Sequence, residues 1–473
     1  MKKKFYYTLC NTLLIIYSVN IACACSTFKL QKDKELIYGH NLNEADLDVP
    51  GMVFINKRGI FKNSRTMLEM MTKWNLKSSD FSWISRYGSV TFNNFGKDFP
   101  DGGINEAGLY IWEMNENSNP PKNRHKPKTN PMNWIQYILD NCSSLDEAIQ
   151  CAYNFQIDGA FGMITWHYFI SDSQGNCAAL AFIDGKVKVN KGTDMPVAGL
   201  FNTPYDREME ILKYYKGFGG QYEIELNNPR VPRFVKAAVL LNDYKSSKDI
   251  VKYGFEILKN LTVDNEPEWS VIIDAKRKNV YFKTRINKEI KHFSMDSLDF
   301  SNKQEVQILD MDIKNGGNVL NQFKPYTNER MRTFLETKMK GLMPANKFNT
   351  FLIVSLDEFV NRFAFHSAKA ELPESQYFTG TWKSKKGSNG EDLNCEISLT
   401  TNKSAVAGTV RFVGGNTYNI DHIYMCGHNL VITYITQKGA MIEIKAILKN
   451  KRMKAGFFGT EDDLGYYTFR TPA

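Results

Sequence analysis

The 473-residue sequence lacks the patterns that mark metal-binding, nucleic-acid-binding and membrane-spanning proteins. It contains no Cys-x-x-Cys pair, and His422 and His428, which flank Cys426, fit no zinc spacing, so we expect no metal and no cofactor. Basic residues give a net charge of +9 but form no stripe interleaved with aromatic residues, so we expect no nucleic-acid partner. No apolar run after residue 24 approaches transmembrane length, so we expect no membrane span.

Cysteine is too scarce for a protein that depends on disulfides. There are eight cysteines, of which Cys10 and Cys23 lie near the start, and the other six are widely spaced along a large chain. Hydrophobic residues make up 42% and charged residues 23% of the chain, which is the composition of an ordinary globular protein. The length allows a sizeable core and more than one domain.

The first residues have the order of a secretory signal peptide. Lys2–Lys4 form a basic start, Thr8–Val19 contains an apolar run, and small residues precede Cys25. We therefore predict a signal peptide over residues 1–24. Its removal would give an exported protein, periplasmic or extracellular, that begins with Cys25.

Cleavage before Cys25 would place a thiol and a free α-amino group on one residue. A thiol with a pKa near ~8.5 is only slightly ionised at neutral pH, whereas an amine with a pKa near ~7.7 is partly unprotonated and can accept the thiol proton. Nucleophile and base then share a residue, and no distant histidine is required. The alternative is a lipidated cysteine. Ala22 stands where a lipid-anchor signal usually has a larger aliphatic residue, and the leader alone leaves both alternatives open.

Strand and helix patterns alternate in blocks after the leader. Ser26–Asn43 predicts a hairpin, and Ser144-Leu145-Asp146-Glu147 predicts a capping box ahead of a helix that runs toward Tyr153. Further strands are predicted at Met52–Asn56, Ser89–Asn93, Leu109–Met114, His167–Asp172, Ala178–Phe182 and Val271–Lys283. Further helices are predicted at Met132–Asp140, Tyr205–Tyr215 and Arg233–Leu241. This alternation favours an α+β architecture.

The chain changes character after Pro373. Short strands with Gly or Asn turns follow, at Tyr377–Lys383, Glu396–Thr401, Ala407–Phe412, Asn429–Thr436, Met441–Ala446 and Tyr466–Arg470. Their even spacing predicts an antiparallel sheet that is closed on itself or folded as a sandwich. We expect a main domain over residues 25–345, a linker over 346–375 and a β accessory domain over 376–473.

Ordered blocks of the main domain resemble the choloylglycine hydrolase and penicillin V acylase family. The blocks are Cys25-Ser26-Thr27-Phe28 with Tyr38-Gly39-His40-Asn41-Leu42-Asn43, Asp101–Leu109, Leu200-Phe201-Asn202-Thr203-Pro204, Arg233–Ala238, and Trp269–Asp274 with Tyr281-Phe282. Together they cover Cys25 to about Arg285. The resemblance implies an N-terminal-nucleophile hydrolase, whose fold is a four-layer αββα sandwich, here with a small all-β C-terminal addition.

The resemblance also assigns roles to single residues. Cys25 would attack the amide carbonyl and form an acyl-thioester, while Asn202, assisted by Asn115, would stabilise the oxyanion. Arg233 would orient the cysteine and favour its thiolate. Each of these residues taken singly has an ordinary structural explanation, and their ordered occurrence favours the catalytic one.

Two positions depart from the family pattern. His40 stands where the family usually has Arg, and Asn43 stands where it has Asp. The Asp normally contacts the α-amino group, so with Asn43 the amine would lose an anionic partner and its pKa should fall. His40 either keeps a hydrogen-bond donor at this place or is a structural histidine on a strand.

We expect the hydrolysis of a linear, non-peptide amide that joins an apolar acyl group to a small polar amine. The family implies bile-acid conjugates, penicillin V or N-acylated amino acids and lactones, and Trp83, Phe92 and Trp112 are candidates to line an acyl pocket. Acyl transfer on the same fold and a lipid-anchored, catalytically impaired binding protein are the alternatives. A homo-oligomer also stays open.

Overall fold

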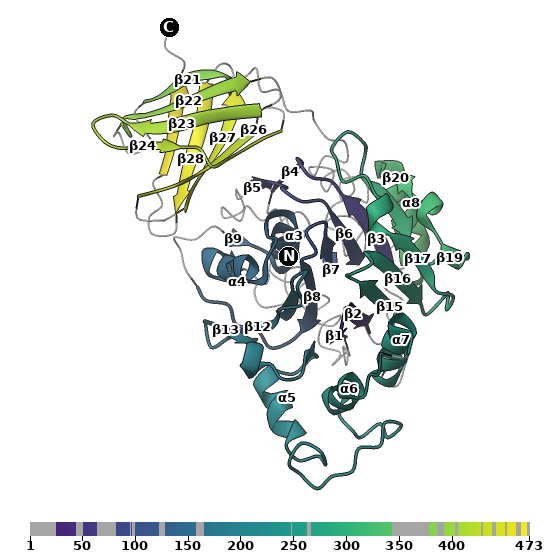
Figure 1. Ribbon diagram of the computed structural model, residues 1–473. Coiled ribbons are helices and arrows are strands. Elements are labelled where there is room, and N and C mark those ends of the chain that lie inside the picture. Colours follow the sequence, from purple (N-terminus) through teal and green to yellow (C-terminus); the bar gives the residue numbers. More distant parts are fainter. Residues whose placement is uncertain are drawn as a thin grey trace, which may run out of the picture.

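The computed structural model describes most of the chain between residues 25 and 470 (Figure 1). The described residues are 25–43, 51–63, 82–94, 96, 100–122, 128–157, 165–246, 248–262, 266–342, 378–385, 392–402, 405–426, 429–437, 441–449, 452–459 and 465–470. The predicted signal peptide over 1–24 and the whole of the predicted linker over 346–375 lie outside them, and both stay predictions.

The N-terminal hairpin lies inside a seven-stranded sheet, the first sheet. Its order is β14 (Gly199–Leu200), β1 (Ser26–Lys32), β2 (Glu35–Leu42), β15 (Trp269–Asp274), β16 (Asn279–Thr284), β17 (Lys291–Ser294) and β19 (Gly317–Asn318). Strand β1 therefore lies between β2, its neighbour in sequence, and β14, whose residues come far later in the chain. The antiparallel register places Thr27 opposite His40 on one side and opposite Leu200 on the other.

A second, nine-stranded sheet faces the first. Its order is β13 (Lys186–Lys191), β12 (Cys177–Ile183), β11 (Trp166–Ser171), β8 (Tyr110–Asn115), β7 (Pro100–Asn105), β6 (Ser89–Asn94), β3 (Gly51–Asn56), β18 (Gln307–Asp310) and β20 (Lys324–Pro325). Successive side chains of a strand point to opposite faces of its sheet, so one face of each sheet is buried against the other. Tyr38 of β2 stacks on Tyr110 of β8 with 4.4 Å between the ring centroids, which fixes the face of β2 that meets the second sheet.

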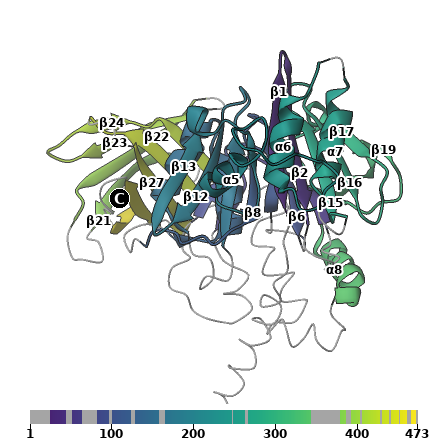
Figure 2. The same ribbon diagram turned by 90° about the horizontal axis from the view of Figure 1, so that it is seen from below.

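Helices cover the outer faces of the two sheets. On the second sheet, α3 (Pro131–Asn141) contacts β7 and β8, and α4 (Leu145–Asn154) contacts β11, β12 and β13. On the first sheet, α7 (Ile250–Asn260) contacts β2 and β15, and α6 (Arg233–Asn242) contacts β14 and α7. In Figure 2, α6 and α7 lie on one side of β1 and β2, while β8 and β12 lie on the other. The remaining strands and α-helices described in this part are β4 (Phe61–Asn63), β5 (Ser82–Ile84), β9 (Lys128–Thr129), β10 (Gln156–Ile157), α5 (Tyr205–Leu212) and α8 (Asn328–Leu342).

The starts of α3 and α4 show why the helices begin where they do. Asn130 precedes α3, and its side chain accepts a hydrogen bond from the Asn133 amide. Ser144 accepts one from the Glu147 amide at 3.3 Å, which confirms the predicted N-cap of α4. The Glu147 carboxylate reaches back one residue further than a standard capping box and accepts from the Ser143 amide at 2.6 Å.

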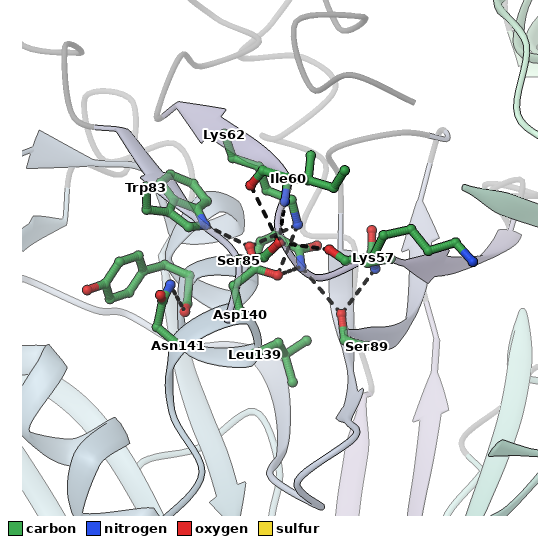
Figure 3. A network of polar contacts seen from close by, with 12 residues as sticks. Lys57, Ile60, Lys62, Trp83, Ser85, Ser89, Leu139, Asp140 and Asn141 are labelled. Carbon is green, nitrogen blue, oxygen red and sulfur yellow. Dashed lines mark hydrogen bonds and ion pairs between the residues drawn. The ribbon is translucent and has the colours of Figure 1, made fainter. Parts of the chain in front are cut away.

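A buried carboxylate ties α3 to the strands above it (Figure 3). Asp140, which is 0% exposed, accepts hydrogen bonds from Lys62 Nζ at 2.8 Å, Trp83 Nε1 at 2.7 Å and Gln136 Nε2 at 2.9 Å. A buried charge of this kind is stable only when it is paired and hydrogen-bonded, as it is here. Trp83 is thus part of the α3 side of the second sheet.

The described C-terminal residues form one nine-stranded antiparallel sheet. Its order is β24 (Thr417–Asn419), β23 (Ala405–Phe412), β22 (Cys395–Asn402), β21 (Gly380–Lys385), β29 (Gly465–Arg470), β28 (Arg452–Gly459), β27 (Met441–Lys449), β26 (Asn429–Ile435) and β25 (His422–Cys426). Two consecutive residues bond to strands near opposite edges of this sheet. The Ile420 amide donates to Gly408 O of β23, and the Asp421 amide donates to Thr433 O of β26. The sheet must therefore be curled. The predicted antiparallel β region is confirmed, and its inner face is filled by side chains such as Trp382 and Phe457.

Most predicted elements are present, and two expectations are corrected. Val271–Lys283 is not one strand but the hairpin of β15 and β16, which turns through Lys278 at a φ of 50°. Trp83, Phe92 and Trp112 do not line one pocket. Trp83 packs with the helices on the outer face of the second sheet, whereas Phe92 and Trp112 pack between the two sheets. The pattern of aromatic residues along the sequence does not reveal to which face of a sheet each one points.

Candidate active site

Cys25 lies directly before β1 and is buried. Because side chains alternate along a strand, Cys25 shares a face with Thr27, whose hydroxyl lies 2.9 Å from the Tyr110 hydroxyl of the second sheet. Ser26 points the opposite way, toward α6. The side chain of Cys25 therefore faces the space between the sheets, while its backbone can be reached from the helix side.

Arg233, the first residue of α6, connects three of the groups around Cys25. One guanidinium nitrogen, Nη1, donates to Cys25 O at 2.6 Å and to Ser26 Oγ at 2.7 Å. The other, Nη2, donates to Asn202 Oδ1 at 3.0 Å. The guanidinium also lies over the Phe201 ring at 5.3 Å from the centroid. A planar fork of fixed donors suits this arrangement better than the single ammonium group of a lysine would.

These contacts fix the orientation of the Asn202 side chain. Since Arg233 carries donors only, the atom of Asn202 that faces it must be the amide oxygen. The amide nitrogen of Asn202 then points the other way and donates to Asn115 O at 3.0 Å. One of its two N–H groups is used in this bond, and the other can be offered to a ligand.

Asn115, the last residue of β8, meets this group through its backbone and not through its side chain. Its side-chain oxygen accepts from Trp166 Nε1 at 2.8 Å. The amide of the next residue, Glu116, bonds Thr165 O beside β11. Backbone groups alternate in direction along a strand, so the N–H and C=O of Asn115 both point to the opposite edge, where Asn202 lies. The structure thus places the backbone carbonyl of Asn115, and not its side chain, against Asn202.

His40 lies between the sheets, beside this network but outside it. Its ring is 0% exposed and stacks on Trp112 with 4.1 Å between centroids. Its Nε2 lies 3.5 Å from Asp101 Oδ2, which also accepts from Trp112 Nε1 at 2.8 Å. Burial lowers the pKa of His40 below 6.5, and the nearby Asp101 opposes this effect. The buried ring is therefore favoured in its neutral form.

Asn43 is buried just past the end of β2. Continuing the register of β1 and β2 by one residue places Cys25 opposite Leu42. Asn43 follows Leu42, so it lies along the strand in the direction of the Cys25 backbone nitrogen. The structure brings Cys25, Asn115, Asn202 and Arg233 into one hydrogen-bonded group. It places His40 on the strand next to Cys25 and Asn43 just past the end of that strand.

The structure adds residues that sequence reasoning did not select. Ser26 Oγ accepts a hydrogen bond from the same Arg233 nitrogen as Cys25 O. Trp166 Nε1 donates to the side-chain oxygen of Asn115. His167 Nε2 is hydrogen-bonded to Phe201 O, directly before Asn202. Glu208 on α5 is buried, which raises its pKa, while a bond from Thr203 and the charge of Arg233 lower it. Ser26 lies inside a recognisable block, but no local signal marks the other three.

Within the described residues, no cluster of three or more His, Cys, Asp or Glu side chains has the arrangement of a metal site. In the same part of the chain, no helix combines the length and the apolar character needed to cross a membrane.

Comparisons with known proteins point to one group of enzymes. The model of the linear amide C-N hydrolases, choloylglycine hydrolase family, matches residues 25–227. Penicillin V acylase of Pectobacterium atrosepticum is 25% identical over 263 residues, which cover 46% of this chain and 69% of that protein. The matched segment begins at Cys25 and includes Asn202, while Arg233 lies six residues beyond it.

One solved structure agrees with this at the level of the fold, and a second is also similar in part. Penicillin V acylase from Agrobacterium tumefaciens superposes with a TM-score of 0.55 at 22% identity, over 64% of this chain and 98% of that chain. A variant of conjugated bile acid hydrolase from Clostridium perfringens gives a TM-score of 0.48 at 18% identity, over 63% and 100% of the two chains. The first of these matches shows an N-terminal-nucleophile-hydrolase-like α+β fold, to which the C-terminal sheet of this chain is additional.

Proposed function

Because the chain belongs to the choloylglycine hydrolase family of linear amide carbon–nitrogen hydrolases, we propose that it cleaves such an amide through an acyl-thioester on Cys25. One observation carries this proposal. A single guanidinium, that of Arg233, bonds both the carbonyl of Cys25 and the side chain of Asn202, so nucleophile and oxyanion donor are held by one rigid group.

The reaction would begin with a proton transfer within Cys25. We propose that removal of residues 1–24 on export frees its α-amino group, which accepts the thiol proton and leaves a thiolate. The nearby positive charge of Arg233 favours the thiolate. Asn43 contributes no negative charge at the amine, so the amine would deprotonate more readily than it would beside an aspartate.

The thiolate would then attack the amide carbon, and negative charge would develop on the carbonyl oxygen. The second N–H of the Asn202 amide and the backbone N–H of Asn115 would be the donors to that oxygen, since the Asn202 amide already contacts the backbone of Asn115. Collapse of the tetrahedral intermediate breaks the carbon–nitrogen bond, and the leaving amine takes the proton held by the α-amino group. Water then hydrolyses the thioester and restores Cys25.

For the substrate, we propose an amide of a bulky apolar acyl group with a small polar amine. The similar proteins are named for penicillin V and for conjugated bile acids, and both ligands have this construction. The aromatic residues between the sheets, among them Phe92 and Trp112, belong to the same buried cluster as Cys25.

The proposal is tested on protein whose first residue is Cys25, verified by intact mass. Phenoxyacetyl, bile-acid and long-chain N-acyl amides are offered in turn, with amine release and the mass of the acylated enzyme as readouts. We expect turnover of at least one substrate class and an acyl adduct on Cys25. Cys25→Ser should abolish both, while Cys151→Ser, which removes a partly exposed thiol outside the site, should abolish neither.

A form that retains Ala24 separates the role of the amine from that of the thiol. It keeps the thiol but moves the free amine by one residue, so we expect little turnover. Full activity of this form, or of Cys25→Ser, would refute the mechanism. A diacylglyceryl group on Cys25 of exported protein would favour the lipid-anchored alternative, and preferential acyl transfer to an added amine would favour an acyltransferase.

A further inference from the structure

The two segments that carry the proposed oxyanion donors are both held by neighbouring residues of β11. Trp166 and His167 start this strand, which pairs with β8 so that Trp166 lies opposite Asn115 and His167 opposite Met114. The indole N–H of Trp166 donates to Asn115 Oδ1 at 2.8 Å. His167 contacts the other segment, since its Nε2 is hydrogen-bonded to Phe201 O, one residue before Asn202.

The bond from His167 crosses between the two sheets. β11 belongs to the second sheet, whereas Phe201 directly follows β14 at the edge of the first sheet. His167 and Phe169 are two positions apart on β11, so their side chains lie on the same face of the strand. Phe169 packs between the sheets, so the His167 ring points toward the first sheet. A strand of one sheet thereby fixes where the last residues of β14 leave the other sheet.

The protonation state of His167 follows from its partner. A carbonyl oxygen accepts only, so Nε2 of His167 must carry a proton, and in the neutral ring Nδ1 then carries none. The ring is 1% exposed, and Nδ1 has no hydrogen-bond partner within the described part of the chain. Burial lowers the pKa of this ring to about 4, with the Phe201 bond opposing the effect, so it is a neutral donor at neutral pH.

From these contacts we infer that Trp166 and His167 form a clamp that sets the spacing of the two oxyanion donors. The clamp residues are positioning residues, because they act through Asn115 and Asn202 and not on the substrate. This inference rests on the proposed function, in which Asn115 and Asn202 stabilise the oxyanion.

Substitutions at His167 separate the hydrogen bond from the space that the ring fills. His167→Phe retains a ring of similar size but removes the donor, whereas His167→Gln retains an N–H that can reach Phe201 O. We expect kcat to fall roughly 10- to 100-fold in His167→Phe with little change in KM, which is less than the loss of a whole donor. His167→Gln should recover most of the rate.

Alkylation of Cys25 by iodoacetamide distinguishes positioning from general damage. This substitution at a saturated carbon develops no oxyanion, so its rate should be the same in wild type and in His167→Phe. In an Asn202→Ala background, His167→Phe should lower kcat little further, since the clamp acts through Asn202. Trp166→Phe, which removes the indole N–H together with part of the ring, should lower kcat at least several-fold.

Three results would overturn the inference. They are an unchanged kcat in His167→Phe, equal losses of kcat and alkylation rate in His167→Phe and His167→Gln, and a full additional loss in the Asn202→Ala background. If His167→Phe does not fold, Trp166→Phe decides, and an unchanged kcat there counts against the clamp. Failure of the proposed function itself would look different, because wild-type protein would then form no acyl adduct on Cys25.

Discussion

Replacing Asn202 by aspartate separates the chemistry of its amide from its place in the fold. The carboxylate has nearly the same shape, and one oxygen can still accept from Arg233 Nη2, where Asn202 Oδ1 now lies at 3.0 Å. The other oxygen replaces the amide nitrogen that donates to Asn115 O at 3.0 Å. Asn202→Asp thus keeps the bond to Arg233, loses the bond to Asn115 and removes the proposed oxyanion donor.

The two effects differ in size. Loss of one oxyanion donor lowers kcat on the order of 10²–10³-fold, and a negative charge where the oxyanion forms adds to that loss. The effect on stability is small by comparison. One hydrogen bond worth about 1 kcal/mol is lost, while the bond to the cationic Arg233 becomes an ion pair. We therefore expect kcat to fall at least 10²-fold while the free energy of unfolding changes by about 1 kcal/mol or less.

The measurement combines turnover, unfolding and thiol labelling on protein that begins with Cys25. Asn202→Asp should be nearly inactive, yet it should unfold close to wild type and react with iodoacetamide at Cys25. Asn202→Ala is the matched control. Unlike Asn202→Asp, it leaves Arg233 Nη2 without its acceptor, so it should lower the free energy of unfolding by about 1–3 kcal/mol. A kcat of Asn202→Asp within tenfold of wild type would show that Asn202 does not stabilise the oxyanion.

Three further predictions concern charge and thiols. Asn43→Asp places a negative charge near the amine of Cys25, which favours the ammonium form, so the acidic limb of the kcat/KM pH profile should move up by about 1 pH unit. Burial lowers the pKa of His167 from 6.5 to about 4, so its stabilising effect is complete above pH 6.5 and is lost as the pH falls through 4. His167→Gln should remove this part of the acid sensitivity in urea unfolding at pH 7 and 4.5, and an unchanged difference between the two pH values would contradict the assignment. The Sγ atoms of Cys142 and Cys151 lie 3.5 Å apart, so a glutathione redox buffer should link them and lower the intact mass by about 2 Da, whereas a Cys151→Ser protein should show no such change.

Local patterns in the sequence predicted most elements of the fold. The hairpin from Ser26, the cap at Ser144 and the start of α6 at Arg233 are all found, because each depends on residues within a few positions of one another. The ordered blocks led to the family, which the comparisons support. Val271–Lys283 was predicted wrongly as one strand, since two short strands joined by a tight turn share the same apolar run.

The atoms that face the candidate site could not be predicted in this way. The sequence indicated Asn115 but not that Trp166 holds its side chain and leaves its backbone facing Asn202. It indicated His40 but not the stacking on Trp112 or the nearby Asp101. These details follow from strand parity and from which strand lies beside which, and neither is written in local periodicity.

The order of amino acids supplies the reactive groups: a cysteine behind a leader-like segment, an asparagine two residues before a proline, and an arginine at a helix start. The packing of the folded chain brings these residues together. Arg233 lies 208 positions from Cys25 in the chain, and they come together because β14 pairs with β1 and α6 packs on that edge. Propensity acts over a few residues, whereas the order of strands in a sheet is set by burial of the whole core, and that order builds the site.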